Sequence, residues 1–272
     1  MNRLKLEIEK AWNEKKMWNT DQNIKDVVFK VIDHLEIGAI RVSNNFNGKW
    51  VVNEWVKKAI IMYFSVQKMN TIELGPLEFY DKIPIKNKFF EKKIRVVPHA
   101  IARYGSYISP GVVLMPSYVN IGAYIGENTM IDTWATVGSC AQIGNRVHVS
   151  GGVGIGGVLE PLQGNPVIIE NDAFIGSRCI LVEGVLIKEG AVLGANVVIT
   201  ASTKIFDVTN EKTIEFKGII PKYSVVIPGS YPKKFPSGIY HVPCAIIIGK
   251  RKESTDKKIS LNEALRTHNL SV

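Results

Sequence analysis

A six-residue repeat runs through the middle of the chain and restricts its possible folds more than any other feature. Between residues 101 and 155 a bulky residue returns at every sixth position, and a small or β-branched residue stands four places after it. The spacing is broken over residues 156–167 and returns over 169–205. The bulky positions are Ile101, Tyr107, Val113, Val119, Ile125, Ile131, Val137, Ile143, Val149 and Ile155, then Ile169, Ile175, Leu181, Ile187, Leu193, Ile199 and Ile205.

A period of six fits neither an amphipathic helix nor an ordinary strand, whose periods are 3.6 and 2. In the hexapeptide signature each hexad supplies one short strand and one turn, and three hexads close a triangular coil of about eighteen residues. The aliphatic side chains point inward, so stacked coils bury one continuous core. The repeat therefore predicts a mainly β fold, a left-handed parallel β-helix.

Two helices and a hairpin are expected before the repeat. Apolar residues between Ile24 and Leu35 mark one face of a helix, and Gly38 is a stop signal. A second helix is expected over 53–67. The hairpin between the helices would have strands over 39–43 and 49–52 with Asn47-Gly48 as its turn, and residues 71–93 are expected to form a proline-containing linker into the repeat.

After the repeat, residues 245–248 are a candidate strand. The run Ser260-Leu261-Asn262-Glu263 has the capping-box pattern that begins a helix. These features predict a mostly helical N-terminal domain, a β-helix domain and a small C-terminal α/β segment, over residues 1–94, 95–230 and 231–272.

The composition suits a globular enzyme with a sizeable core, since 46% of the 272 residues are hydrophobic and 22% are charged. The chain has no apolar run of about eighteen residues, and its start alternates charged and aliphatic residues instead of resembling a signal peptide. We therefore expect a cytoplasmic protein. Cys140, Cys179 and Cys244 have no C-x-x-C spacing, so they indicate buried thiols and no metal site.

The net charge of +9 calls for an anionic partner. Nucleic acid would require clustered basic residues with aromatics, and a membrane surface would require a basic amphipathic helix. The basic residues are dispersed, which favours a phosphorylated cofactor, although at least half of the lysines are expected to be plain solvated surface. Candidates for contact with its phosphates lie in or beyond the last coils: Lys204, Lys222, Lys233, Lys234, Lys250 and Arg251.

Residues 152–157 formally match the dinucleotide-binding pattern G-x-G-x-x-G. That motif needs a strand before it and a helix after it. Here the glycines stand in hexad register, so tight turns and a loop that leaves the coil are the favoured interpretation.

Acyl transfer from a thioester to an amine needs a base for the ammonium proton. Asp132 is the leading candidate, because it follows the inward Ile131 and should point outward at a corner; a carboxylate that caps turn amides is the equal alternative. His148 is a rival base, since histidine titrates near neutrality, and Glu160 and Glu183 are weaker ones. Arg95 can anchor a substrate carboxylate through its guanidinium fork, or be a surface cation.

Three runs strongly resemble the tetrahydrodipicolinate N-succinyltransferase family: LMPSYVNIGAY at 114–124, MIDTWATVGSCAQIG at 130–144 and SGGVGIGGVLEPL at 150–162. They are more specific than the hexapeptide pattern, which many acyltransferases share. The resemblance extends to GAIRV at 38–42, RVVP at 95–98 and NEALR at 262–266, and so spans nearly the whole chain.

The resemblance implies a homotrimer with active sites between neighbouring β-helices, which transfers succinyl from the cosubstrate succinyl-CoA to the amino group of ring-opened tetrahydrodipicolinate, with no permanently bound cofactor. Asp132 matches the catalytic and substrate-binding aspartate, and Arg95 matches the substrate-binding arginine. Ser139 and Glu160, inside the matching runs, are further predicted substrate-binding residues. The residues matching the part that lines the CoA arm are Gly176, Ser177, Ala201 and Lys204.

One position departs from the family. Three positions before Glu183, where members often have glutamate, this chain has Ile180. Any role of that acidic residue is therefore in doubt here, and Glu183 does not simply inherit it.

Three other functions were weighed. A hexapeptide acetyltransferase acting on the same acceptor would differ in donor preference. A β-helix carbonic anhydrase needs three histidines around a metal, whereas His148 stands nearly alone among the coils. A structural scaffold would have a more uniform face than the irregular polar residues between Asp132 and Glu160.

Overall fold

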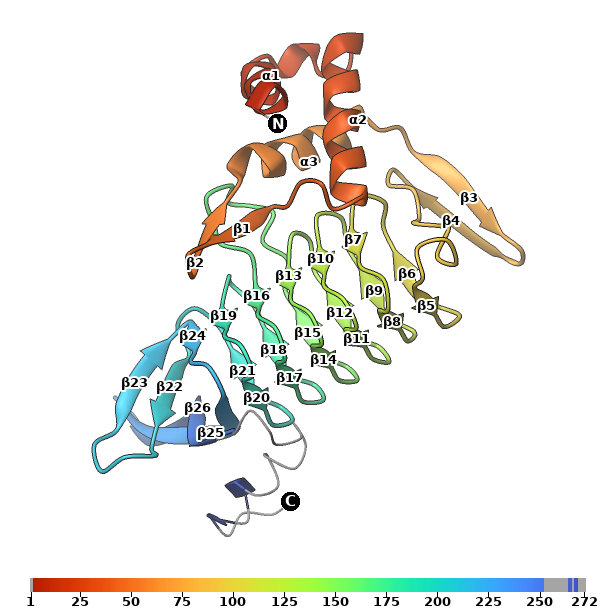
Figure 1. Ribbon diagram of the computed structural model, residues 1–272. Helices are drawn as coiled ribbons and strands as arrows, with labels where there is room; N and C mark the ends of the chain where they lie inside the picture. Colours follow the sequence, from red (N-terminus) through yellow and green to blue (C-terminus); the bar gives the residue numbers. More distant parts are fainter. Residues whose placement is uncertain (1, 252–263, 266, 269–272) are drawn as a thin grey trace.

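The computed structural model describes residues 2–251, 264–265 and 267–268. A helical part lies against the side of a long coil of short strands, above β7 (Tyr107–Ile108), β10 (Tyr124–Ile125) and β13 (Gln142–Ile143), and a part rich in longer strands lies at the far end of the coil (Figure 1). The capping-box helix expected to begin at residues 260–263 starts outside the described residues.

The N-terminal part contains α1 (Asn2–Trp12), the short 3-10 helix η1 (Lys15–Met17), α2 (Gln22–Glu36) and α3 (Glu54–Val66). The carboxylate of Asp21 accepts a hydrogen bond from the Asn23 amide at 2.8 Å and so caps α2, which typically contributes about 1 kcal/mol. The helices α2 and α3 lie where the sequence predicted them, and α1 was not predicted. None of the described helices is long and apolar enough to span a membrane.

Short parallel strands form the three faces of the coil. The first face carries β5 (Arg95–Val96), β8 (Val113–Leu114), β11 (Met130–Ile131), β14 (His148–Val149), β17 (Phe174–Ile175) and β20 (Val192–Leu193). The second face carries β6 (Ile101–Ala102), β9 (Tyr118–Val119), β12 (Thr136–Val137), β15 (Gly154–Ile155), β18 (Ile180–Leu181) and β21 (Val198–Ile199). The third face carries β7 (Tyr107–Ile108), β10 (Tyr124–Ile125), β13 (Gln142–Ile143), β16 (Ile168–Ile169), β19 (Leu186–Ile187) and β24 (Ile219–Ile220).

The chain passes from the first face to the second at the first corner, from the second to the third at the second corner, and back to the first at the third corner. Inside the coil a column of aliphatic side chains, among them Ile131, Val137 and Ile143, is fully buried. Each such side chain contributes roughly 1.5–3 kcal/mol when it leaves water.

The predicted register is wrong in the first coil. The inward residues there are Ala102, Ile108 and Leu114, whereas Ile101, Tyr107 and Val113 face outward. The corner between Leu114 and Val119 is one residue short, and from Val119 onward the predicted six-residue register holds.

Residues 156–167 leave the coil as a loop between β15 and β16, at the second corner, and rise beside α3 (Figure 1). The loop departs through a close approach of two backbones. A Cβ atom added to Gly138 would lie 2.2 Å from the Gly157 nitrogen, so only glycine fits at Gly138 without displacing the chain.

The C-terminal part continues the first face. It contains β22 (Lys204–Asp207), β23 (Ile214–Lys217) and the long antiparallel pair β25 (Ser224–Phe235) and β26 (Gly238–Lys250), in which β25 also pairs with β20. Ala245 and Ile247 of β26 join the aliphatic column beneath the last coil. The predicted strand over 245–248 is thus part of a longer one, and the expected boundary at residue 230 falls within β25.

Two hairpins flank the coil near its N-terminal end. The first joins β1 (Ser43–Phe46) to β2 (Lys49–Val52) through the predicted Asn47-Gly48 turn, although its first strand begins later than expected. The second, β3 (Asn70–Leu74) with β4 (Leu77–Asp81), occupies residues that the sequence analysis expected to be a linker.

Candidate active site

Asp132 stands at the first corner, directly after β11. Its Oδ1 accepts hydrogen bonds from the Thr133 amide at 2.7 Å and the Thr133 hydroxyl at 3.3 Å. Within the described part of the chain no cation pairs with this carboxylate. The turn-capping alternative is therefore realised at one oxygen, and Oδ2 remains available to a ligand.

The first corner continues from Asp132 into the coils below it. The Asp132 amide donates to the Val149 carbonyl, and the Ser150 amide donates to the Ile175 carbonyl, so Ser150 and Gly176 occupy the same place in successive coils. Strands of a sheet are about 4.8 Å apart, which puts Gly176 about 10 Å along the corner from Asp132. The predicted cofactor residue Gly176 and the predicted base thus share one row.

Arg178 is a basic residue of this corner that the sequence analysis missed. It is exposed, and no carboxylate among the described residues pairs with it. A Cβ atom added to Gly152 would lie 3.3 Å from Arg178 Cγ, so the Arg178 stem runs across the bare backbone of the coil between it and Asp132. The signal was its place directly after Gly176-Ser177, at the corner position of the hexad.

Exposed apolar side chains lie at the first corner and on the neighbouring second face. Trp134 is 73% exposed at the first corner, in the place that Gly152 and Arg178 hold in the following coils, and Ile180 and Val198 are 38% and 45% exposed on paired strands of the second face. On that face Ile180 also pairs with Gly154, which has no side chain to cover the surface. We call Trp134, Ile180 and Val198 the apolar strip; nothing in the sequence repeat distinguished these outward positions from ordinary surface.

The second corner and the loop that leaves it hold three further predicted residues, Ser139, Glu160 and Glu183. The Ser139 carbonyl accepts a hydrogen bond from the Val158 amide at 3.2 Å, and Glu160 is exposed two residues further along the loop. Glu183 Oε2 accepts from the Ala201 amide at 3.1 Å. Glu183 therefore caps a turn at this corner, whereas Ile180 projects from the second face, so the two residues occupy different places.

Other predicted residues are separated from both corners or already paired. Arg95 is exposed on β5, two strands from Met130, and does not contact Asp132. His148 stacks on Phe174 with ring centroids 5.0 Å apart, on the outer first face. Lys204 donates to Glu215 at 3.0 Å, and this hydrogen bond raises the pKa of Lys204.

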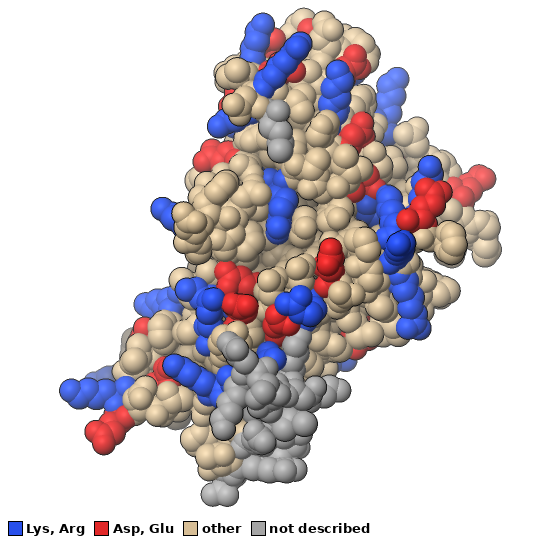
Figure 2. Space-filling view, viewed as in Figure 1, with Lys and Arg blue, Asp and Glu red and all other residues tan. Residues whose placement is uncertain are grey.

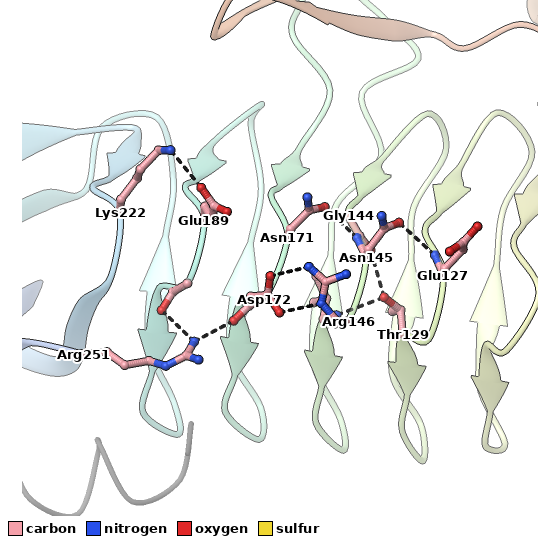
Figure 3. A network of polar contacts seen from close by, with 12 residues as sticks. Glu127, Thr129, Gly144, Asn145, Arg146, Asn171, Asp172, Glu189, Lys222 and Arg251 are labelled. Carbon is pink, nitrogen blue, oxygen red and sulfur yellow. Dashed lines mark hydrogen bonds and ion pairs between the residues drawn. The ribbon is translucent and has the colours of Figure 1, made fainter. Parts of the chain in front are cut away.

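The remaining basic candidates are dispersed. Lys and Arg are interspersed with Asp and Glu on the face in Figure 2. Lys222 pairs with Glu189 at 2.8 Å, and Arg251 donates to the Asp172 carbonyl at 3.0 Å. Both belong to a polar ladder along the third corner, across the prism from the second face (Figure 3).

Burial of the thiols raises the pKa of Cys140 and of Cys179 to about 12. Neither cysteine is therefore a nucleophile near neutral pH. Among the described residues no three His, Cys, Asp or Glu side chains are grouped so that they could hold a metal ion.

Three family models match the chain. The model described as tetrahydrodipicolinate N-succinyltransferase N-terminal matches residues 3–66, and the models described as bacterial transferase hexapeptide (six repeats) and hexapeptide repeat of succinyl-transferase match residues 122–157 and 166–201. The coil and these matches define an acyltransferase of the hexapeptide-repeat class.

Relatives of similar length give the family. The chain is 49% identical to the 2,3,4,5-tetrahydropyridine-2,6-dicarboxylate N-succinyltransferase of Acinetobacter baylyi, over 98% of this chain and 99% of that one. It is 47% identical to the enzyme of the same name from Sodalis glossinidius, with the same coverage, and 49% identical to that from Rhodopseudomonas palustris, over 91% and 92%. The chain belongs to the tetrahydrodipicolinate N-succinyltransferase family.

A solved structure supports the fold. A Campylobacter jejuni protein, provisionally assigned as a 2,3,4,5-tetrahydropyridine-2-carboxylate N-succinyltransferase, superposes with a TM-score of 0.53 at 18% identity, over 82% of this chain and 62% of that one. The predicted left-handed β-helix and the predicted family are both confirmed.

Proposed function

We propose that this chain transfers the succinyl group of succinyl-CoA to the amino group of ring-opened tetrahydrodipicolinate, with Asp132 as the base. The observation that carries this proposal is the placement of Asp132. One of its carboxylate oxygens is held by the Thr133 turn, and the other is unpaired at a corner whose next coils lead to Gly176. A fixed carboxylate beside an open row suits proton removal from a bound ammonium group.

In the proposed step Asp132 first takes a proton from the ammonium group of the acceptor. The amine nitrogen then attacks the thioester carbonyl carbon of succinyl-CoA. The new C–N bond forms as the carbonyl oxygen becomes an oxyanion, and the C–S bond then breaks. Nitrogen loses a second proton as the CoA sulfur leaves, and the CoA thiolate takes up that proton. The proton held by Asp132 then passes to solvent. The products are a succinyl amide and free CoA.

The other predicted residues receive binding roles in this proposal. Arg95 holds a substrate carboxylate through its guanidinium fork. Ser139 and Glu160 bind the acceptor from the second corner. Arg178, exposed at the same corner two coils beyond Asp132, is an additional cation for the anionic donor. The residues proposed to line the CoA arm are Gly176, Ser177, Ala201 and Lys204, and succinyl-CoA enters as a cosubstrate without a permanent cofactor.

A homotrimer is part of the proposal, because one chain separates its predicted residues. Asp132 and Glu160 stand at different corners with the second face between them, and the apolar strip leaves three large apolar side chains exposed on and beside that face. A neighbouring coil packed there would close a site from both sides. We place this enzyme in the cytoplasm, where its acyl-CoA donor is available, and propose neither a nucleic-acid nor a membrane partner.

The test is release of CoA thiol from succinyl-CoA and from acetyl-CoA, with and without tetrahydrodipicolinate. We expect acceptor-dependent release with succinyl-CoA, and a fall in kcat of about 10²–10⁴-fold in Asp132→Asn, the usual contribution of a general base. Glu127→Gln, at an exposed third-corner carboxylate, is the matched control and should retain full activity. If the enzyme used acetyl-CoA as well as succinyl-CoA, the assignment of succinyl-CoA as the donor would be wrong. Full activity of Asp132→Asn would show that Asp132 is not the base.

A further inference from the structure

Lys57 is a fully buried lysine on α3. Its exposed fraction is 0%, and its helical neighbours Val56, Ala59 and Ile60 are all part of the apolar cluster of the N-terminal helices. No carboxylate among the described residues forms an ion pair with it. A charge in such a place is costly unless hydrogen bonds satisfy it, and burial lowers the pKa of Lys57.

The hydrogen bonds of Lys57 go to the loop that leaves the coil. Its Nζ donates to the Gly164 carbonyl at 2.6 Å and to the Pro161 carbonyl at 3.4 Å. The Gly164 amide itself donates to the Pro161 carbonyl at 2.9 Å, so these residues form a closed turn. The ammonium group therefore binds the turn that begins directly after Glu160.

The loop is held on the other side of Glu160 as well. The Val158 amide donates to the Ser139 carbonyl at 3.2 Å, and Leu159 packs against the helical cluster that includes α3. Glu160 is exposed, and its carboxylate forms no hydrogen bond or ion pair with the described residues. Its position is therefore set by its neighbours, with Leu159 before it and the Lys57-bound turn after it.

We propose that Lys57 is a positioning residue, which fixes the loop so that Glu160 faces the acyl acceptor at the second corner. This inference rests on the proposed function, in which Glu160 binds the acceptor. A lysine that only filled space could be replaced by an apolar side chain of similar length. Lys57 instead donates a hydrogen bond to the Gly164 carbonyl, which accepts from no backbone amide of the described residues, and it does so next to the one acidic residue of the loop.

The experiment compares Lys57→Met, which keeps the length but loses the donors, with Lys57→Arg, which keeps the donors. Lys58→Met, at the neighbouring lysine that pairs with Glu9 outside the loop, is the matched control. In Lys57→Met we expect the KM for tetrahydrodipicolinate to rise about 10-fold or more, because displaced binding groups cost affinity and rate. The KM for succinyl-CoA should change less than about 2-fold, and Lys57→Arg should recover part of the loss.

A double variant separates positioning from plain stability. If Lys57 acts through Glu160, Lys57→Met should add less than about 2-fold to the acceptor KM in a Glu160→Gln background, because coupled residues are not additive. Fully multiplicative effects, or an unchanged acceptor KM in Lys57→Met, would overturn the proposal. Should Lys57→Met fail to fold, Lys57→Gln, which keeps an amide donor, takes its place in the cycle.

Hydrogen exchange at the loop amides gives a readout that does not depend on the reaction. The Gly164 amide should exchange at least about 10-fold faster in Lys57→Met than in the native protein and the Lys58→Met control. Unchanged exchange would refute the clamp itself. If exchange is faster in Lys57→Met but the native protein releases no CoA thiol, the clamp is supported and the proposed function is wrong.

Discussion

Lys86 and Glu36 form an ion pair in the interior, with Lys86 Nζ 2.5 Å from Glu36 Oε1. Glu36 ends α2, and Lys86 lies in the segment that leads into the coil. Glu36 also accepts a hydrogen bond from the Gly105 amide at 3.0 Å, at the start of the coil. The pair therefore joins the helical part to the first coil.

This pair predicts a particular dependence of stability on pH. Burial, more than the opposing effect of Glu36, lowers the pKa of Lys86 from 10.5 to about 8. Below pH 8 Lys86 is charged in both the folded and the unfolded protein, so the cost of burying its charge fully lowers the free energy of unfolding. Between pH 8 and 10.5 the unfolded chain binds more protons, so this residue should raise the free energy of unfolding by up to about 3 kcal/mol.

Urea unfolding at pH 7.5 and pH 10.5 measures the effect as the difference between the native protein and Lys86→Met. The difference should grow in favour of the native protein as pH rises. Lys30→Met, at an exposed lysine of α2, is the control and should follow the native pH profile. A native-minus-variant difference that stays constant or shrinks would show that Lys86 keeps an ordinary pKa in the folded protein.

A second prediction concerns the two glycines that flank the departing loop. Gly138→Ala forces a Cβ to within 2.2 Å of the Gly157 backbone and should cost about 1–3 kcal/mol, as overpacking does. In Gly154→Ala the nearest atom is Ile180 Cδ1 at 2.9 Å, the end of a flexible side chain that can move aside. Thermal unfolding should therefore show a marked loss of Tm for Gly138→Ala only. Equal losses would mean that the approach at Gly138 relaxes freely.

A third prediction concerns the apolar strip and the proposed trimer. Val198 is 45% exposed within one chain, so Val198→Glu should leave the fold of that chain intact. A charge buried at a contact between chains is costly, and it should shift the assembly toward smaller species. Light scattering after size exclusion measures the mass, and circular dichroism checks the fold. A trimer that persists at all concentrations, or a native protein that is monomeric, would contradict the assignment of this face.

The sequence predicted the coil because the inward aliphatic side chains recur at a spacing of six residues. It failed in the first coil, where Tyr107 and Val113 also suit strands and only the short corner after Leu114 reveals the shift. The second hairpin was missed because the proline-containing stretch 71–93 was expected to be a linker, whereas Gly75-Pro76 forms the turn between β3 and β4. Apolar and polar residues alternate from Thr71 onward, and that was the available signal.

The candidate site was less accessible to sequence reasoning. Asp132 and Gly176 could be assigned to one corner once the hexad register was known, because corner positions repeat with the coil. The loop interrupts the six-residue spacing, so its position cannot be read from the repeat. The contact of Lys57 with Gly164, more than a hundred positions away, therefore has no pattern in the sequence that predicts it. The resemblance implied sites between neighbouring β-helices, but it did not indicate which of the named residues lie at which corner.

The long pair β25 and β26 has a consequence for how these molecules behave in crowded solution. A stack of parallel strands ends in open backbone, which is an attachment point for another strand and so a starting point for fibres. The hairpin occupies the end of the first face by pairing with β20, and Ala245 and Ile247 cover the aliphatic column there. The hairpin thus takes the place that the first-face strand of a further coil would occupy, so another copy of the chain cannot extend this face by pairing with β20.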